Sequence, residues 1–170
     1  MSIKDTGKRP AAPQTARQPS NAVALESGAA GRDDQNGFAS LLRDLTSNQR
    51  RAIDAIRLGF PATLLKDTAI YFDVSAGRIR SIVRLPETTA HALAKRGANM
   101  DAAASERLWR LAHLVAMAQD VFEDDEAAKT WLRSPNRVFG DAAPMDYLDT
   151  EPGAMSVRQV LNAIATGGAA

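Results

Sequence analysis

Apolar side chains recur at intervals of three and four residues along most of this chain, an interval typical of amphipathic α-helices. Stretches with this spacing predict eight helices, at residues 38–45, 49–58, 61–72, 76–85, 86–96, 102–122, 125–134 and 154–165. Residues 135–153 contain three prolines, and the apolar side chains between them predict a loop that wraps the surface of the fold. The expected fold class is all-α, with a small helix-turn-helix bundle followed by a second helical domain.

Single residues indicate the ends and the buried faces of several predicted helices. The helix that ends near Leu58 follows a cap at residues 46–48 and is expected to turn Ile53 and Ile56 inward. Gly59 stops it, because a left-handed C-cap favours glycine. Ser75 is a typical N-cap for the helix that follows it. The apolar stripes expected on the next two helices are Leu64, Leu65, Thr68, Ala69 and Phe72, and then Ile79, Ile82 and Val83.

The helices at 76–85 and 86–96 are separated only by the break that Pro86 imposes, since proline cannot continue a helix but suits the first turn of the next. Two short helices joined by a tight turn in a small trihelical core form the helix-turn-helix pattern, whose second helix lies in the DNA major groove. The residues expected to contact phosphates are Arg78, Arg80, Arg84 and Lys95. Those expected to contact base edges are Thr88 and His91.

This pattern departs from the usual helix-turn-helix at two positions. The bend normally carries glycine where this chain has Arg84, and a small alanine normally packs where it has Arg80. A positive φ at a non-glycine residue costs about 1 kcal/mol, which a fold tolerates. A second interpretation therefore stays open, in which the motif keeps its fold but has lost DNA binding. His91 is equally well explained as an exposed polar residue.

Composition agrees with the helical prediction and excludes several kinds of chemistry. The chain has 32 alanines and 5% aromatic residues. It has no cysteine and two histidines, which excludes a disulfide scaffold and leaves no plausible zinc site. Nucleotide-binding glycine loops and nucleophile motifs are absent, so we expect neither an enzyme nor a cofactor. No apolar run reaches 18 residues and the first 20 residues lack a signal-peptide core, so a cytoplasmic protein without a membrane partner is expected.

Charge is distributed unevenly along the chain although the formal net charge is +1. Residues 38–100 contain ten basic and five acidic side chains, whereas residues 101–170 contain six and eleven. A basic middle predicts a polyanionic partner and an acidic end predicts a basic protein surface, although accidental segregation on solvated faces stays open. Residues 1–37 are rich in proline and poor in apolar residues, which predicts a disordered tail. The expected domains are therefore 1–37, 38–100 and 101–170.

Short motifs from residue 105 onward resemble one known family. They are Ser-Glu-Arg-Leu at 105–108, Trp-Leu at 131–132 followed by Pro-Asn at 135–136, Pro-Met-Asp at 144–146, Leu-Asp-Thr at 148–150, and Gly153, Val157 and Leu161 before Gly167. In this order they resemble the toxin-binding domain of the Xre/MbcA/ParS antitoxins. Residues 62–97 show a weaker similarity to the Xre-like helix-turn-helix domain of the same proteins.

The resemblance implies an antitoxin of a type II toxin-antitoxin system. Such proteins pair with RES-domain toxins, which degrade NAD⁺ or transfer ADP-ribose, cover the toxin active site with their C-terminal region, and repress their own operon as dimers. The partners implied are a cognate RES-domain toxin, operator DNA and a second copy of this chain. The candidate toxin-binding residues are Trp131, Pro135, Asn136, Asp146, Asp149, Glu151, Val157, Leu161, Gly167 and Gly168.

Several of these candidates have a second explanation. Trp131, Leu132 and Leu161 stand at helical spacing and are equally well explained by core packing. Two departures from the family pattern affect the toxin-binding end: the usual double glycine is Gly140-Asp141 here, and no aromatic residue follows the last glycine. A different class of function also stays open, a free-standing helix-turn-helix regulator whose acidic C-terminal domain serves dimerisation or another partner.

Overall fold

The computed structural model describes residues 36–168, which form one compact helical unit. The α-helices are α1 (Asn36–Thr46), α2 (Gln49–Leu58), α3 (Leu64–Phe72), α4 (Ala76–Val83), α5 (Glu87–Lys95), α6 (Ala102–Phe122), α7 (Asp125–Arg133) and α8 (Glu151–Ala165). Two 3₁₀-helices, η1 (Arg137–Phe139) and η2 (Pro144–Tyr147), lie between α7 and α8. The all-α prediction is confirmed. Asn36 and Gly37 belong to α1, and the rest of the predicted tail lies outside the described residues.

Local capping signals place the helix boundaries as expected. The Asn48 side chain accepts a hydrogen bond from the Arg51 N–H at 3.0 Å and begins α2, and Ser75 accepts one from the Arg78 N–H at 3.2 Å and begins α4. Gly59 ends α2 with a φ of 83°, the positive value that favours glycine. These contacts join residues close in sequence, so the sequence alone carries the signal for them.

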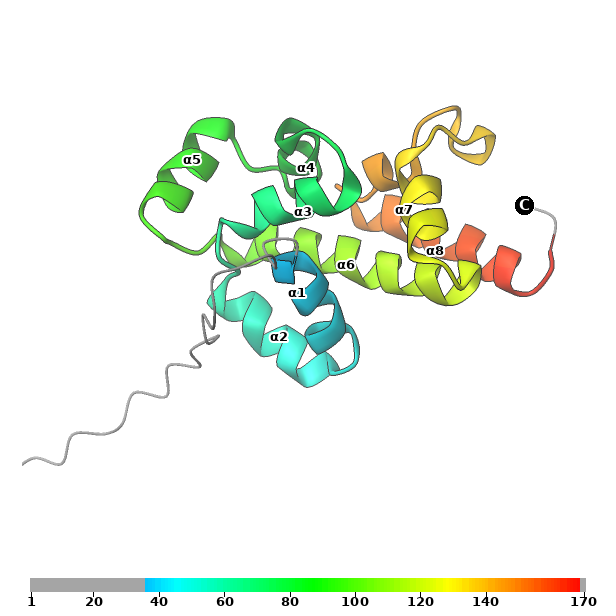
Figure 1. Cartoon of the computed structure of the whole chain (residues 1–170), viewed down its shortest axis with the longest axis horizontal. Helices are drawn as coiled ribbons and strands as arrows, with labels where there is room; N and C mark the ends of the chain where they lie inside the picture. Colours follow the sequence, from blue (N-terminus) through cyan, green and yellow to red (C-terminus); the bar gives the residue numbers. More distant parts are fainter. Residues whose placement is uncertain (1–35, 169–170) are drawn as a thin grey trace, which may run out of the picture. The chain divides into compact units, whose positions relative to one another are not determined.

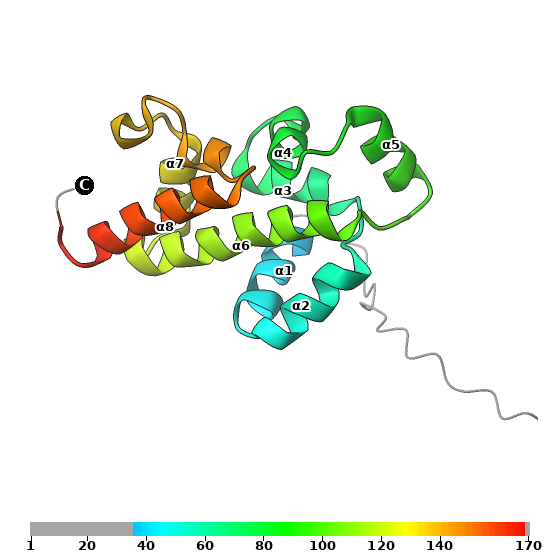
Figure 2. The same ribbon diagram turned by 180° about the vertical axis from the view of Figure 1, so that it is seen from behind.

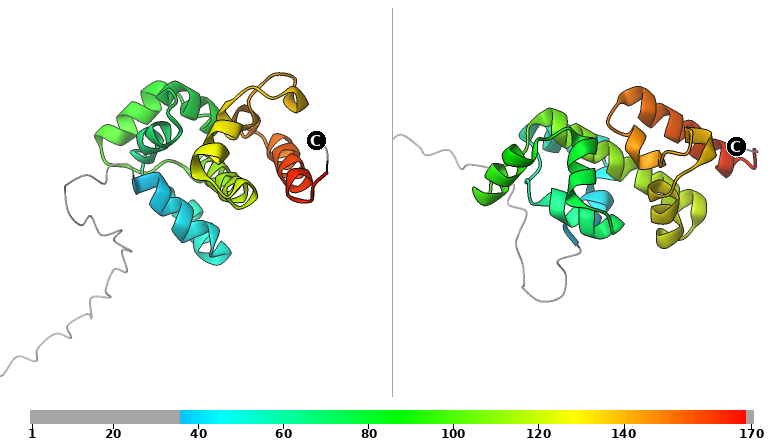
Figure 3. Two further views of the ribbon diagram at one scale, coloured as in Figure 1. Left: turned by 45° about the vertical axis from the view of Figure 1, so that its right-hand side comes forward. Right: turned by 90° about the horizontal axis from the view of Figure 1, so that it is seen from above.

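The long helix α6 runs through the middle of the described residues (Figure 1) and packs against α1, α2, α4, α7 and α8. Seen from behind, α8 lies alongside α6 (Figure 2). The two further views show α5 at the opposite end of the unit from the end of α8 (Figure 3). One buried cluster spans all these helices, so α6 is a shared structural element of the N-terminal and C-terminal helices.

The predicted apolar stripes of α3 and α4 are buried without exception. One expectation for α2 is wrong: Ile53 is 42% exposed, and the neighbouring Ala52 is the residue that α2 buries. The final helix also begins three residues earlier than predicted. Thr150 caps it and Pro152 occupies its first turn, where the missing N–H of proline has no cost.

The part of the chain from residue 36 to 168 has no helix with the length and the apolarity that a membrane span requires. Within the same residues, no cluster of three or more histidine and carboxylate side chains is arranged to hold a metal ion.

Candidate functional site

The helices α4 and α5 meet at a tight turn, and Arg84 is the residue that makes it. Its backbone has a φ of 56° and a ψ of 43°, the left-handed conformation that favours glycine. The Arg84 N–H and the Leu85 N–H donate to carbonyl oxygens of the last turn of α4 and close that helix. The sequence therefore places an arginine where the backbone requires positive φ, as predicted from the missing glycine.

The face of α5 that points away from the core carries the candidate base-contacting residues. Ala90 is buried and docks α5 on the core together with the half-buried Leu93. Thr88, His91 and Lys95 are exposed. This side of α5 is accessible and can approach a duplex.

The arginine side chains expected to contact phosphates are engaged within the chain. Arg80 lies 3.4 Å from the Glu87 carboxylate at the start of α5. Arg78 donates from Nε and Nη2 to the two carboxylate oxygens of Asp146, both at 2.8 Å. Arg84 donates from Nη2 to Asp149 at 2.8 Å. Two candidate DNA contacts are thus paired with two candidate toxin contacts, an arrangement that the sequence analysis did not foresee.

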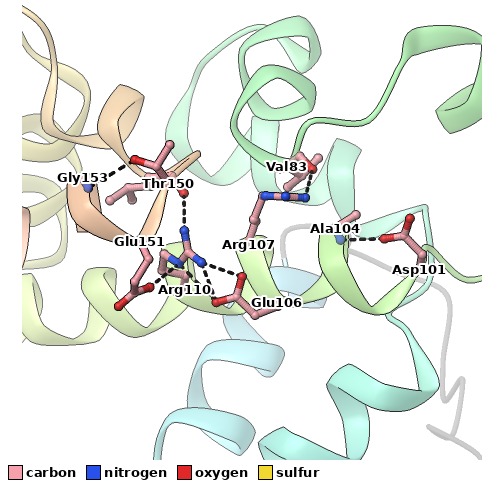
Figure 4. Close-up of polar contacts among 10 residues, drawn as sticks. Val83, Asp101, Ala104, Glu106, Arg107, Arg110, Thr150, Glu151 and Gly153 are labelled. Atoms are coloured by element: carbon pink, nitrogen blue, oxygen red, sulfur yellow. Dashed lines mark hydrogen bonds and ion pairs between the residues drawn. The ribbon is translucent and has the colours of Figure 1, made fainter. Parts of the chain in front are cut away.

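The Ser-Glu-Arg-Leu motif lies in the first half of α6 and holds several elements together. Ser105 is completely buried, and its hydroxyl accepts a hydrogen bond from the Phe60 N–H at 2.8 Å. Arg107 donates to the Val83 carbonyl oxygen at 3.3 Å and so ties α6 to the end of α4 (Figure 4). Through Arg107, the motif therefore holds the end of α4, where the turn of the helix-turn-helix begins, against α6.

Arg110 ties α6 to the C-terminal segment in the same way as Arg107 ties it to α4. Its side chain is only 9% exposed, and the guanidinium forms an ion pair with Glu106 at 2.7 Å and another with Glu151 at 3.3 Å. Nη1 also donates to the carbonyl oxygen of Leu148 at 3.3 Å. A buried cation needs this set of acceptors, because an unpaired charge in the interior is costly. Glu151, a candidate toxin contact, is therefore also a structural partner of Arg110.

A second polar junction joins α3 to α7. The Tyr71 hydroxyl donates to Asp125 at 2.6 Å, and the Lys129 ammonium contacts the same carboxylate at 2.8 Å while lying over the Tyr71 ring. Burial and the neighbouring Asp125 raise the pKa of Tyr71, so the phenol stays a donor. Burial alone raises the pKa of Asp125, but hydrogen bonds from Lys129, Tyr71 and Gln119 outweigh it and lower that pKa. Sequence reasoning missed this junction.

The loop between α7 and α8 rests on aromatic contacts. Trp131 is half-buried and packs against Phe122 and Phe139, with ring centroids 5.8 and 6.3 Å apart. The Asn136 side chain accepts a hydrogen bond from the Val138 N–H and its backbone pairs with Ala142, so the loop closes on itself. Pro135 and Val138 are exposed. Trp131 and Asn136 thus have structural roles, and Pro135 and Val138 offer free surface.

The structure shows why the family pattern favours glycine at two positions, which are Asp141 and Gly153 in this chain. Asp141 has a φ of 64°, next to Gly140 with a φ of 65°, so the site where a second glycine is usual has the backbone that glycine prefers. Gly153 lies in the first turn of α8, and a Cβ atom there would overlap the carbonyl oxygen of Tyr147. Glycine is required at this position because a neighbouring backbone approaches it closely.

The expectation that Val157 and Leu161 contact the toxin is not supported by their positions. Both were expected among the toxin-contacting residues, but neither has any exposed area, because they form the core face of α8 against α6. They support the surface and are not part of it. Gly167, with a φ of 71°, and Gly168 follow the C-cap Thr166 and are exposed.

Comparison with known proteins adds two family matches. Residues 51–113 match the antitoxin Xre-like helix-turn-helix domain, and residues 117–167 match the antitoxin Xre/MbcA/ParS C-terminal toxin-binding domain. Together the two matches support an antitoxin of the Xre/MbcA/ParS type.

Two of the chain's relatives are named antitoxin Xre. The protein of Pseudomonas putida strain KT2440 is 43% identical over 63 residues, which is 37% of this chain and 40% of that protein. The protein of Yersinia enterocolitica is 23% identical over 116 residues, which is 68% of this chain and 78% of that protein. The match to the Pseudomonas antitoxin thus spans less than half of its length.

In this Xre/MbcA/ParS-type chain, the two domain matches meet within α6. The helix-turn-helix match ends at residue 113 and the toxin-binding match begins at residue 117, between which α6 is continuous. The helix that carries Ser105, Arg107 and Arg110 therefore joins the two domains. The i,i+4 spacing of Glu106 and Arg110 is a local signal for this joint, because oppositely charged side chains at that spacing meet on a helix.

Proposed function

We propose that this chain is an antitoxin that binds and neutralises a cognate toxin through its C-terminal domain and represses its own operon through α5. The observation that carries the proposal is the presence, in one chain and in order, of a helix-turn-helix match and a toxin-binding match. The site of action proposed is the cytoplasm, where operon DNA and an intracellular toxin are both found.

The toxin proposed is of the RES-domain class, which the family resemblance implies. Its active site must accept the anionic diphosphate of NAD⁺, so basic groups are expected to line it. The carboxylates of Asp146, Asp149 and Glu151 are the proposed counterparts by charge, and each is at least one-third exposed. Pro135, Asn136, Gly167 and Gly168 supply the remaining proposed contact surface. Trp131 supports this surface through its aromatic neighbours.

The DNA contacts proposed are Thr88 and His91 to base edges and Lys95 to phosphate, all on the exposed face of α5. Lys95 has no ion-pair partner among the residues that the structure describes, so its charge is free to meet a phosphate. Arg78, Arg80 and Arg84 are proposed as further phosphate contacts. We also propose a homodimer, because a two-fold operator needs two recognition helices.

The test of neutralisation is co-expression with the product of the adjacent gene, with an affinity tag on one partner only. We expect the two chains to purify together, and NAD⁺ consumption to appear once the antitoxin is removed. A chain that purifies alone, beside a partner whose activity it never changes, would overturn the toxin-binding part of the proposal. It would support instead a free-standing transcriptional regulator.

A truncation tests the part of the terminal residues. The Thr166 hydroxyl donates to the Asn162 carbonyl oxygen at 3.0 Å and closes α8, so removing residues 167–170 keeps this cap. We expect the shortened chain to keep its helical circular dichroism and to lose protection of cells that express the toxin. Full protection by the shortened chain would show that the tail does not contribute.

A further inference from the structure

Two ion pairs join the helix-turn-helix to the loop before α8. Arg78 on α4 donates to both carboxylate oxygens of Asp146 in η2 at 2.8 Å, and more weakly to the Arg133 carbonyl oxygen at 3.3 Å. Arg84 at the end of α4 contacts Asp149 at 2.8 Å from Nη2 and at 3.3 Å from Nε. The pairs connect residues 65 and 68 positions apart, and α4 and η2 are in direct contact there.

All four side chains are at least partly accessible to solvent. The Arg78 and Asp146 side chains are 28% and 43% exposed, and those of Arg84 and Asp149 are 55% and 33% exposed. A partly exposed pair contributes little to stability, so it can open at small cost. Both pairs are therefore able to exchange partners without unfolding the helices that carry them.

A guanidinium that holds a carboxylate through two N–H groups has the same donor geometry that it uses for a phosphate. In a helix-turn-helix the first helix crosses the DNA backbone, which brings phosphates to the region of Arg78 and Arg84. The guanidinium N–H groups that bind Asp146 or Asp149 are then unavailable to a phosphate. Asp146 and Asp149 in turn cannot meet a basic toxin surface while they hold these arginines.

We propose that the Arg78–Asp146 and Arg84–Asp149 pairs couple toxin binding to DNA binding, with each partner releasing the residues that the other needs. The coupling rests on the proposed function, since it requires both partners. Its sign is positive: a toxin that takes Asp146 and Asp149 frees Arg78 and Arg84 for phosphates. By thermodynamic reciprocity, DNA bound first strengthens toxin binding by the same factor. An exposed pair limits the effect to about fivefold for each arginine released.

The decisive experiment measures binding of the full chain to a labelled duplex taken from the region upstream of its own gene, over a range of salt concentrations. Asp146→Asn and Asp149→Asn each remove the negative charge that holds one arginine, and they keep the shape of the side chain. Asp141→Asn removes the same charge from an exposed position of the same loop that has no arginine partner in the described residues. Circular dichroism and thermal melts establish that each variant is folded.

We expect Asp146→Asn and Asp149→Asn to tighten DNA binding by about two- to fivefold beyond Asp141→Asn. The slope of log K against log salt should steepen by about 0.9 for each arginine that gains a phosphate. In the Asp149→Asn background, Arg84→Ala should abolish the gain. Equal binding by Asp149→Asn, Asp146→Asn and the Asp141→Asn control would overturn the coupling and leave the proposed DNA binding intact. Loss of DNA binding by every folded variant and the wild type would overturn both.

The same duplex also tests whether toxin binding strengthens DNA binding. Adding the purified product of the adjacent gene should lower the Kd of the wild-type chain for DNA by a similar factor. The double variant Asp146→Asn with Asp149→Asn should show a smaller change, because its arginines have already lost their carboxylate partners. A toxin that weakens wild-type binding, or that shifts both proteins equally, would overturn the coupling while leaving the toxin interaction itself established.

Discussion

The hydroxyl oxygen of Ser105 accepts a hydrogen bond from the backbone N–H of Phe60, 2.8 Å away and 45 positions earlier in the chain. Phe60 lies just after α2 and Ser105 lies in the first turn of α6, so one buried contact fixes where the chain enters the core of the helix-turn-helix domain. The serine of the Ser-Glu-Arg-Leu motif is therefore a structural residue.

Replacing Ser105 with alanine should destabilise the fold by about 1–3 kcal/mol, because the Phe60 N–H is left buried without an acceptor. Urea denaturation followed by circular dichroism measures this. Ser156→Ala on α8 is the control, since that exposed hydroxyl donates to Pro152 and its loss should change stability by less than about 0.5 kcal/mol. Equal midpoints for the two variants would contradict the role of Ser105.

Gly153 and Gly77 both lie near the start of a helix, yet alanine should act on them in opposite directions. Gly153→Ala forces a methyl group into the Tyr147 carbonyl and should cost about 1–3 kcal/mol. At Gly77 the added Cβ meets its nearest atom at 3.6 Å, an ordinary contact, so Gly77→Ala should raise stability by up to about 1 kcal/mol. Thermal melts of the two variants test the difference, and a stabilised Gly153→Ala would show that the loop before α8 gives way.

The signals that the sequence carried well were local. Helix caps at Asn48 and Ser75 and the stripe of α3 depend on residues within one or two turns, so spacing alone identified them. Ile53 was misassigned because α2 is short and its buried face is narrow, with Ala52 as the residue that packs. Pro152 suggested a loop, whereas its position after the Thr150 cap makes it a helix-starting residue.

The contacts that relate the two domains had no such signal. Arg78 and Asp146 stand 68 positions apart, and nothing near either residue specifies its partner. The charge counts predicted a separate partner for the basic block and for the acidic block, but opposite charges in one chain also attract each other. The candidate residues were identified by type, and their pairing depended on the tertiary fold.

Asp141 tests the cost of a positive φ away from any crowded site. Asp141 and Gly140 have nearly the same φ, and a Cβ added at Gly140 would meet no atom within 4 Å. A substitution there therefore changes the stability only through the preference of a positive φ for glycine. Asp141→Gly should stabilise the chain by up to about 1 kcal/mol, and Gly140→Ala should destabilise it by about 1 kcal/mol. Chemical denaturation of both variants checks the pair. A gain from Gly140→Ala would show that the loop changes its conformation.

His113 makes stability depend on pH near neutrality. Its ring stacks on Trp109 with centroids 5.2 Å apart; burial, followed by the nearby Arg158 charge, lowers the pKa of His113 in the folded chain. The unfolded chain therefore takes up this proton first as pH falls, so the free energy of unfolding should decrease below about pH 6.5, the ordinary histidine value. It should stop decreasing on this account below the folded pKa.

The substitution His113→Phe keeps an aromatic ring against Trp109 and removes the titrating group. We expect it to flatten the loss of stability between about pH 7.5 and 5.5, a window that lies above the ordinary carboxylate pKa values. His91→Phe, at an exposed position of α5, is the matched control and should keep the wild-type slope. Thermal melts at closely spaced pH values measure both slopes. If His113→Phe lost stability with acid as steeply as the control, the burial of His113 could not be the source of the pH dependence.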